Sequence, residues 1–218
     1  QGQGGFLANV RSLLTGDLSA LLPRMPPQTR FSRDVSAHRV FEAVSLPLVD
    51  FRAIRQQVPK ATINDQFLCI VGGALHAYLS AKKELPDTLM VGMVPMTLRG
   101  QEKGGDVGNQ VGFTLMPVHS EIEDPLERLR AICDAAATSK RVTDAIGKEL
   151  ARDMLETLPS IVADPLLRNV QTPRIGLIVS NVRGPDVPLY MAGAQLVNYA
   201  PISIALDGMG LNVTAFSY

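Results

Sequence analysis

The chain has 218 residues, of which 46% are hydrophobic and 19% charged, a composition that is typical of a folded globular protein and argues against disorder. Lys plus Arg and Asp plus Glu both number 21, so the formal net charge of zero gives no electrostatic reason to expect a nucleic-acid partner or a polybasic membrane anchor. The two cysteines, Cys69 and Cys133, form no Cys-x-x-Cys pattern. They suit a reducing compartment, predict no metal site, and are expected to be core or near-core thiols.

The first 27 residues predict a Gly- and Gln-rich linker followed by an amphipathic helix over residues 6–22. We expect this helix to pack on its own domain or on a domain that the chain lacks, and contact with a bilayer is the alternative. The chain closes on "GLNVTAFSY", an alternating strand pattern with no helix behind it. Both ends therefore suggest a piece of a longer protein, with a domain over residues 28–218 that is truncated at its C-terminal end.

The next elements are a strand, "HRVFEAVSLPL" (38–48), a short helix, "LVDFRAIRQQV" (48–58), and a long helix within residues 60–83. Thr62 or Asn64 can cap the long helix. Each of its two adjacent glycines, 72 and 73, costs about 1 kcal/mol of helix stability, so we expect a sheet or another helix to approach closely there. The apolar stripe of this helix is expected to be Phe67, Ile70, Val71, Ala74, Leu75, Tyr78 and Leu79.

Strand patterns recur in the second half of the chain, separated by two more helices. Residues 88–100 and 108–119 predict strands, and "EDPLERLRAICDAAATSK" predicts a helix with Asp124 as its N-cap in a capping-box arrangement. The apolar stripe of this helix is expected to be Leu126, Leu129, Ile132, Cys133 and Ala136. A further helix is expected over 144–159. The remaining strands are expected at 174–182, 194–206 and 210–218. This order of elements predicts an α/β fold with a mixed sheet flanked by helices.

The sequence contains few groups that could carry catalysis by themselves. His38, His76 and His119 are not adjacent and do not sit at metal-ligand spacing. We expect His76 to be a core or boundary histidine and His119 to be exposed. No Gly-x-Ser-x-Gly elbow and no phosphate-binding loop is present, so the residues do not form a recognisable catalytic triad.

Four polar pairs are expected at the ends of regular elements. Taken singly, each reads as a helix cap, a solvated strand end or a turn. Taken together, they suggest strand ends that meet around a cleft, which is where α/β folds usually bind ligands. The pairs are Asn64 and Asp65, Thr97 and Arg99, Gly108 and Asn109, and Ser180 and Asn181.

The same residues carry a resemblance to a known family, the bacterial wax ester synthase/acyl-CoA:diacylglycerol acyltransferases. "ATINDQFLCIVGGALHAYL" resembles that family's T-x-N-D helix, and "MVPMTLRG" resembles its V-P-x-S/T-L-R strand. "GNQVGFTLMPVHSEIEDPLERLRAI", "SNVRGPDVPLYMAGAQL" and "GLNVTAFSY" resemble three further stretches in the same order. The similarity runs from about residue 28 to residue 218. Arg183 departs from the family pattern, which usually has Pro there.

The resemblance implies one half of a two-lobed fold like that of chloramphenicol acetyltransferase, with a tunnel between the lobes. It implies an O-acyltransferase that uses acyl-CoA as co-substrate, binds no cofactor tightly, and esterifies a fatty alcohol or diacylglycerol. The family's general base is the His of an HHxxxDG motif in the N-terminal half, and this sequence has no such motif. The chain is therefore expected to be the C-terminal half, inactive alone, with the N-terminal half of the same protein as its partner.

The resemblance also implies site roles and a location. Asn64, Asp65, Asn109, Ser180 and Asn181 match the family's ND, GN and SNV motifs and are expected to bind substrate or support the site, together with Thr97 and Arg99. A cytoplasmic location is expected, with contact to the inner membrane or lipid inclusions as a further expectation. Two alternatives stay open: half of a condensation-type acyltransferase, and a non-catalytic lipid-binding or scaffold module.

Overall fold

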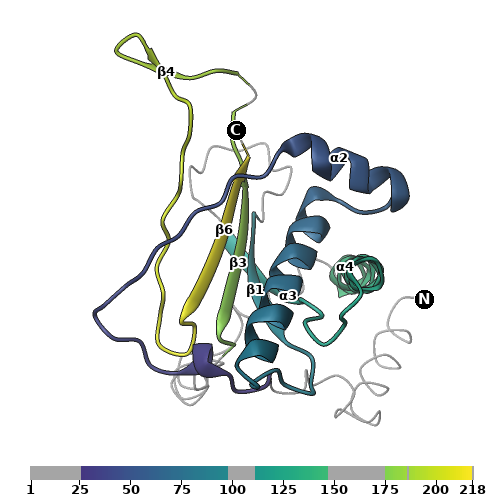
Figure 1. Ribbon diagram of the computed structural model, residues 1–218. Helices are drawn as coiled ribbons and strands as arrows, with labels where there is room; N and C mark the ends of the chain where they lie inside the picture. Colours follow the sequence, from purple (N-terminus) through teal and green to yellow (C-terminus); the bar gives the residue numbers. More distant parts are fainter. Residues whose placement is uncertain (1–25, 98–110, 147–174, 186, 218) are drawn as a thin grey trace, which may run out of the picture.

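A computed structural model describes residues 26–97, 111–146, 175–185 and 187–217. They form a four-stranded sheet whose order is β2-β1-β3-β6, with α3 and α4 packed on one face (Figure 1). The expected linker and helix at residues 1–25 lie outside the described residues. The helices are α2 (Leu48–Gln57), α3 (Ile63–Ala81) and α4 (Pro125–Ile146), and the strands are β1 (Val91–Thr97), β2 (Val111–Pro117), β3 (Leu177–Arg183), β4 (Tyr190–Met191), β5 (Ala194–Gln195) and β6 (Leu211–Ser217).

The sheet is mixed, as the sequence predicts. β1 and β2 pair antiparallel from Val91↔Pro117 to Thr97↔Val111. β1 pairs with β3 in parallel at Met93↔Ile178, and β3 pairs with β6 in parallel along its whole length. Three of the four strands therefore point the same way, and their carboxyl ends lie at the same end of the sheet.

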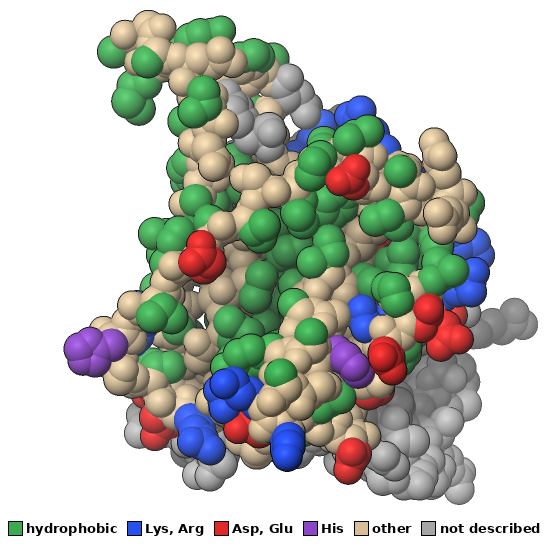
Figure 2. Space-filling model, in the orientation of Figure 1, with side chains coloured by type: hydrophobic (Ala, Val, Ile, Leu, Met, Phe, Trp, Pro, Cys, Tyr) green, Lys and Arg blue, Asp and Glu red, His purple; other side chains and the backbone are tan. Residues whose placement is uncertain are grey.

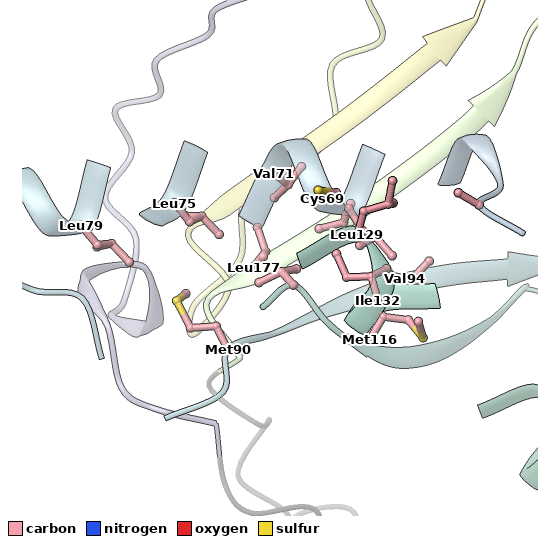
Figure 3. Close-up of a cluster of buried hydrophobic side chains, with 14 of the residues drawn as sticks. Cys69, Val71, Leu75, Leu79, Met90, Val94, Met116, Leu129, Ile132 and Leu177 are labelled. Atoms are coloured by element: carbon pink, nitrogen blue, oxygen red, sulfur yellow. The ribbon is translucent and has the colours of Figure 1, made fainter. Parts of the chain in front are cut away.

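The core lies between the sheet and the two helices. Leu68 and Leu79 of α3, Ile132 of α4 and Leu177 of β3 are fully buried, and Figure 3 shows side chains from all of these elements converging. The helical stripe predicted for α4 is confirmed, because Leu129 and Ile132 are buried and Leu126, Cys133 and Ala136 pack against the core.

The stripe predicted for α3 is only partly right. Val71, Leu75 and Leu79 are buried as expected, but Ile70 and Tyr78 are exposed. The helix instead buries Leu68 and Cys69. Apolar residues lie on nearly every side of this helix, so helical periodicity alone could not show which side the sheet and α4 cover.

The two adjacent glycines of α3 mark a close approach, as expected. A Cβ atom at Gly72 would lie 1.9 Å from the carbonyl oxygen of Val118, in the loop after β2. A Cβ atom at Gly73 would lie 2.6 Å from Nη1 of Arg128 on α4. Only glycine lets both neighbours come this near.

Three predicted elements differ from the structure. Residues 38–47 form neither helix nor strand, and β5 is the only strand within 194–206. β4 and β5 make a short hairpin whose turn residues, Ala192 and Gly193, both have positive φ. Hydrophobic alternation predicted strands in both segments, but apart from the β4–β5 pairing the described chain offers them no neighbouring strand. α4 also continues to Ile146, so the break expected before residue 144 is absent; the rest of the expected 144–159 helix lies outside the described residues.

Candidate functional site at the carboxyl ends of the strands

The carboxyl ends of β1, β3 and β6 lie at the same end of the molecule as the beginning of α3 (Figure 1). A short loop connects α3 to β1, so the helix runs opposite to the parallel strands. The positive end of the helix dipole therefore faces the edge where α/β folds commonly bind ligands. The described members of the predicted polar pairs lie toward this end: Asn64 and Asp65 in the first turn of α3, Thr97 at the end of β1, and Ser180 and Asn181 in the second half of β3.

Asp65 is committed to holding the first turn of α3 together. Its Oδ2 atom accepts hydrogen bonds from the backbone N–H and the hydroxyl of Thr62, both at 2.8 Å. The Thr62 hydroxyl oxygen in turn accepts from the Asp65 N–H at 3.2 Å, which completes a capping box. Asp65 is 5% exposed. Its carboxylate is thus a structural cap with little capacity left for a substrate.

The negative charge of Asp65 affects the pKa of a thiol on α4, that of Cys133. Burial is the main cause that raises the pKa of the Cys133 thiol, and the negative charge of Asp65 is the next. Burial also raises the pKa of Cys69, against the lowering effect of the nearby Arg128 guanidinium. Neither thiol forms a disulfide; Cys69 is buried and Cys133 packs against the core, which confirms the expectation of core or near-core cysteines.

Asn64 is the member of the ND pair that remains available. Its side chain is half-buried, and it has no hydrogen-bond partner within the described ranges. The amide offers both a donor and an acceptor at the helix N-terminus. Asn64 is therefore the polar group in the first turn of α3 that could contact a substrate or a companion domain.

Gln66 is a polar residue that the sequence patterns did not single out. It is 2% exposed, and neither Nε2 nor Oε1 has a partner in the described structure. Buried carboxamides normally make hydrogen bonds, so this one is a conspicuous exception. Its only signal in the sequence is a polar side chain directly after Asn64 and Asp65 in an otherwise apolar helix.

Ser180 and Asn181 do not end their strand, contrary to the prediction. β3 continues to Arg183, and the two residues pair with Thr214 and Ala215 of β6. Because β6 extends beside them, the backbone keeps its ladder past the small polar residues. What does change at this point is burial: Leu177, Ile178 and Val179 are buried, whereas Ser180 and Asn181 are half-exposed.

The two side chains also point to opposite faces of the sheet. Asn181 lies on the same face as Leu177 and Val179, which pack against the helices, and Ser180 lies on the other face. They therefore cannot act as one adjacent pair. Thr97 is the last residue of β1, at the same end of the sheet, while Arg99 and Asn109 lie outside the described residues.

A buried arginine fixes the loop that follows β2. Arg128 donates from Nε and Nη2 to the carbonyl of Ile122, and from Nη2 to the carbonyl of Glu123 at 2.9 Å. His76 Nδ1 makes a 2.7 Å hydrogen bond with the carbonyl oxygen of Ser120, which confirms a satisfied boundary histidine. His119 is half-buried and not exposed as expected, because it pairs with Glu121. These contacts hold the loop against α3 and α4. The signal in the sequence was the pair of glycines in α3, which predicted a close approach at this place.

An open hollow of about 770 Å³ lies beside this loop, away from the strand ends. Its lining includes the carboxylates of Glu121, Glu123, Asp124 and Glu127. Apolar chains would find little contact there, and phosphate groups would be repelled by the negative charge. We therefore do not assign substrate binding to it.

Exposed apolar side chains gather on two segments that have little secondary structure. We call residues 38–47 the first arm and residues 187–206 the second arm. The second arm projects beyond the sheet and carries hydrophobic side chains along its length (Figures 1 and 2). It contains no charged residue, and more than half of each of these side chains is exposed: Val187, Tyr190, Met191, Val197, Tyr199, Ile202 and Ile204. A run of exposed apolar side chains without charges usually marks an interaction surface.

The sheet, its helix layer and the projecting arms define one half of a two-lobed chloramphenicol-acetyltransferase-like fold. The solved wax ester synthase/diacylglycerol acyltransferase from Marinobacter aquaeolei VT8 matches with a TM-score of 0.69 and 25% identity, over 97% of this chain and 47% of that one. A family model described as the WS/DGAT C-terminal domain matches residues 107–218. The chain belongs to the wax ester synthase/diacylglycerol acyltransferase family.

Two curated relatives agree with this assignment. O-acyltransferase WSD of Acinetobacter baylyi is 34% identical over 88% of this chain and 42% of its own length. A protein named as a diacylglycerol O-acyltransferase in Mycobacterium tuberculosis, Rv3740c, is 34% identical over 98% of this chain and 50% of its own length. The chain thus spans about half the length of the relatives it matches. Among the helices of the described ranges, none combines the length and apolar composition needed to cross a bilayer.

Proposed function

We propose that this chain is the C-terminal half of an acyl-CoA-dependent O-acyltransferase that transfers a long-chain acyl group to a fatty alcohol or diacylglycerol. The observation that carries the proposal is the match of residues 107–218 to the C-terminal domain of the family, in a sequence without an HHxxxDG motif. The general base then belongs to the N-terminal half. The exposed second arm supports this division, because its apolar side chains need a companion surface.

The proposed chemistry is acyl transfer from sulfur to oxygen. A His of the other half takes the proton of the acceptor hydroxyl, and the oxygen forms a bond to the thioester carbonyl carbon. The tetrahedral intermediate carries an oxyanion that requires hydrogen-bond donors. Its collapse breaks the carbon–sulfur bond, and the proton passes from the imidazolium to the coenzyme A thiolate. The ester and free coenzyme A leave.

The residues of this chain would shape the site from the strand-end side. Asn64 presents an amide that no described residue engages at the positive end of α3, while Asp65 holds that end in place. By family resemblance, Thr97, Arg99, Asn109, Ser180 and Asn181 contribute to the same region, with Asn181 and Ser180 serving different faces of the sheet. The apolar acceptors would be met at the surface of the inner membrane or of lipid inclusions.

A pair of variants in the full-length protein tests the site. Asn64→Ala should lower kcat/KM for palmitoyl-CoA and hexadecanol by roughly 10- to 100-fold, because lost positioning at a reacting centre has effects of this size. The Tm should stay unchanged, since Asn64 holds no other described residue. Gln56→Ala, on the exposed surface of α2, is the control for removing an amide elsewhere. Equal activity of Asn64→Ala and wild type would contradict a role for the helix start in the site.

A further inference from the structure

The first arm shows a conflict between sequence and structure. "HRVFEAVSL", residues 38–46, has the alternation and β-branched residues of a strand. The structure shows it drawn out across the front of the sheet, without strand pairing (Figure 1). A sequence suited to a strand that stays unpaired among the described residues is explained if its pairing partner lies in a part of the protein that the structure does not describe.

The backbone of the first arm has no strand partner among the described residues. Its hydrogen bonds are local: Ala43 N–H donates to the side chain of Glu42 at 3.2 Å, and Arg39 donates to the carbonyls of Ser36 and His38. From residue 39 to 46, no backbone group bonds to another segment of the described chain. Such a row of unpaired N–H and C=O groups is a template for an added strand.

Both ends of the first arm are anchored, so the segment is held open. Before it, the carbonyl of Arg33 accepts from Gly208 N–H at 3.1 Å, and Val35 N–H donates to Asp207 at 2.8 Å. After it, α2 begins at Leu48. Anchoring of this kind reduces the entropy that the segment would lose on binding.

The side chains of the first arm also lack a partner. Val40 is 101% exposed, Val44 81% and Leu46 51%. In a strand these three share one face, while Phe41 lies on the other. Burying one such side chain fully is worth about 1.5–3 kcal/mol, so the arm gains from a packed neighbour as well as from a hydrogen-bonded one.

We propose that residues 38–46 form a β-strand by adding to an open sheet edge in the half of the protein that this chain lacks. The inference deepens the proposed function and depends on it for the existence of that half. The relatives extend over about twice the length of this chain, so the proposed partner strand would belong to the same polypeptide. A tethered edge has an effective concentration in the millimolar range, which favours it over a second copy of the chain.

Hydrogen exchange resolved to single amides in the full-length protein tests this inference. In a strand paired on one side, alternate N–H groups point to the partner. We expect one set, either 39, 41, 43 and 45 or 40, 42 and 44, to exchange at least 100-fold more slowly than the other. Free exchange at every amide would overturn the inference. Protection that appears only at high protein concentration would also overturn it, because it would identify a second copy as the partner.

A proline pair provides the matched variants. Ala43→Pro and Val44→Pro remove adjacent N–H groups, only one of which can point to the partner strand. The variant at the slowly exchanging position should abolish the protection of the arm, and its neighbour should keep most of it. Equal effects would argue for side-chain docking without strand pairing. If either variant fails to fold, the wild-type exchange pattern still decides. Neither readout uses acyl transfer, so failure here is separable from failure of the proposed function.

Discussion

Replacing Gly72 by Ala should destabilise the protein, although alanine is the better helix former. The added Cβ would lie 1.9 Å from the Val118 carbonyl oxygen, whereas real Cβ atoms essentially never come within 3.0 Å, so α3 and the loop must separate by about 1 Å. Overpacking of this kind costs about 1–3 kcal/mol, and the rigid backbone contact places this site at the upper end. Helix propensity returns about 1 kcal/mol.

The net loss is therefore about 2 kcal/mol, which corresponds to a fall in Tm of roughly 4–8 °C for a domain of this size. Scanning calorimetry of the full-length protein measures it. Gly73→Ala is the matched control, because its Cβ meets the tip of the Arg128 side chain and not backbone, and we expect a smaller loss. If Gly72→Ala raised the Tm, propensity would dominate and the close packing of α3 on the loop would be refuted.

Asp65→Ala should remove the capping box and lower the free energy of unfolding by about 1–2 kcal/mol, so any fall in activity should be accompanied by a fall in Tm. A loss of activity at constant Tm would instead show that Asp65 acts directly in the reaction. Arg128→Met should lower the free energy of unfolding by about 3 kcal/mol, because it removes three hydrogen bonds to loop carbonyls. Calorimetry of the Gly73→Ala/Arg128→Met double variant should show a smaller loss of stability than the sum of the two single variants. Strict additivity would mean that the two residues are not in contact. Cys69 should react with iodoacetamide far more slowly in the native protein than in the unfolded protein. Because folding raises the pKa of Cys69, the contribution of this thiol to stability is present below about pH 8.5 and is lost as the pH rises further. The pKa of Glu84 is lowered, chiefly by its hydrogen bonds to Arg30, so its contribution is present above about pH 4.3 and lost below; Glu84→Gln should flatten the acid side of the Tm profile.

Local signals in the sequence predicted much of this fold correctly. The helical stripe of α4, the Thr62 cap and the apolar run of β3 depend on neighbouring residues, and all were found. The paired glycines predicted a close approach, but they could not name the partner, because Val118 and Arg128 are brought there by the tertiary fold.

The errors have a common physical cause. Residues 38–48 and 194–206 have strand patterns, but pairing is a property of two segments, and the sequence of one cannot show whether the other is present. The same holds at the candidate site. The polar residues Ser180 and Asn181 suggested a strand end, yet β6 continues the ladder beside them and the pleat separates their side chains.

The most direct test of the split site compares coenzyme A release from palmitoyl-CoA and hexadecanol by the full-length protein and by this 218-residue chain. If the imidazole that accepts the proton resides in the companion half, the full-length protein turns over and the chain alone stays at background. Release by the isolated chain above background would show that the residues described here are sufficient for catalysis, and the division of the active site between two halves would be wrong.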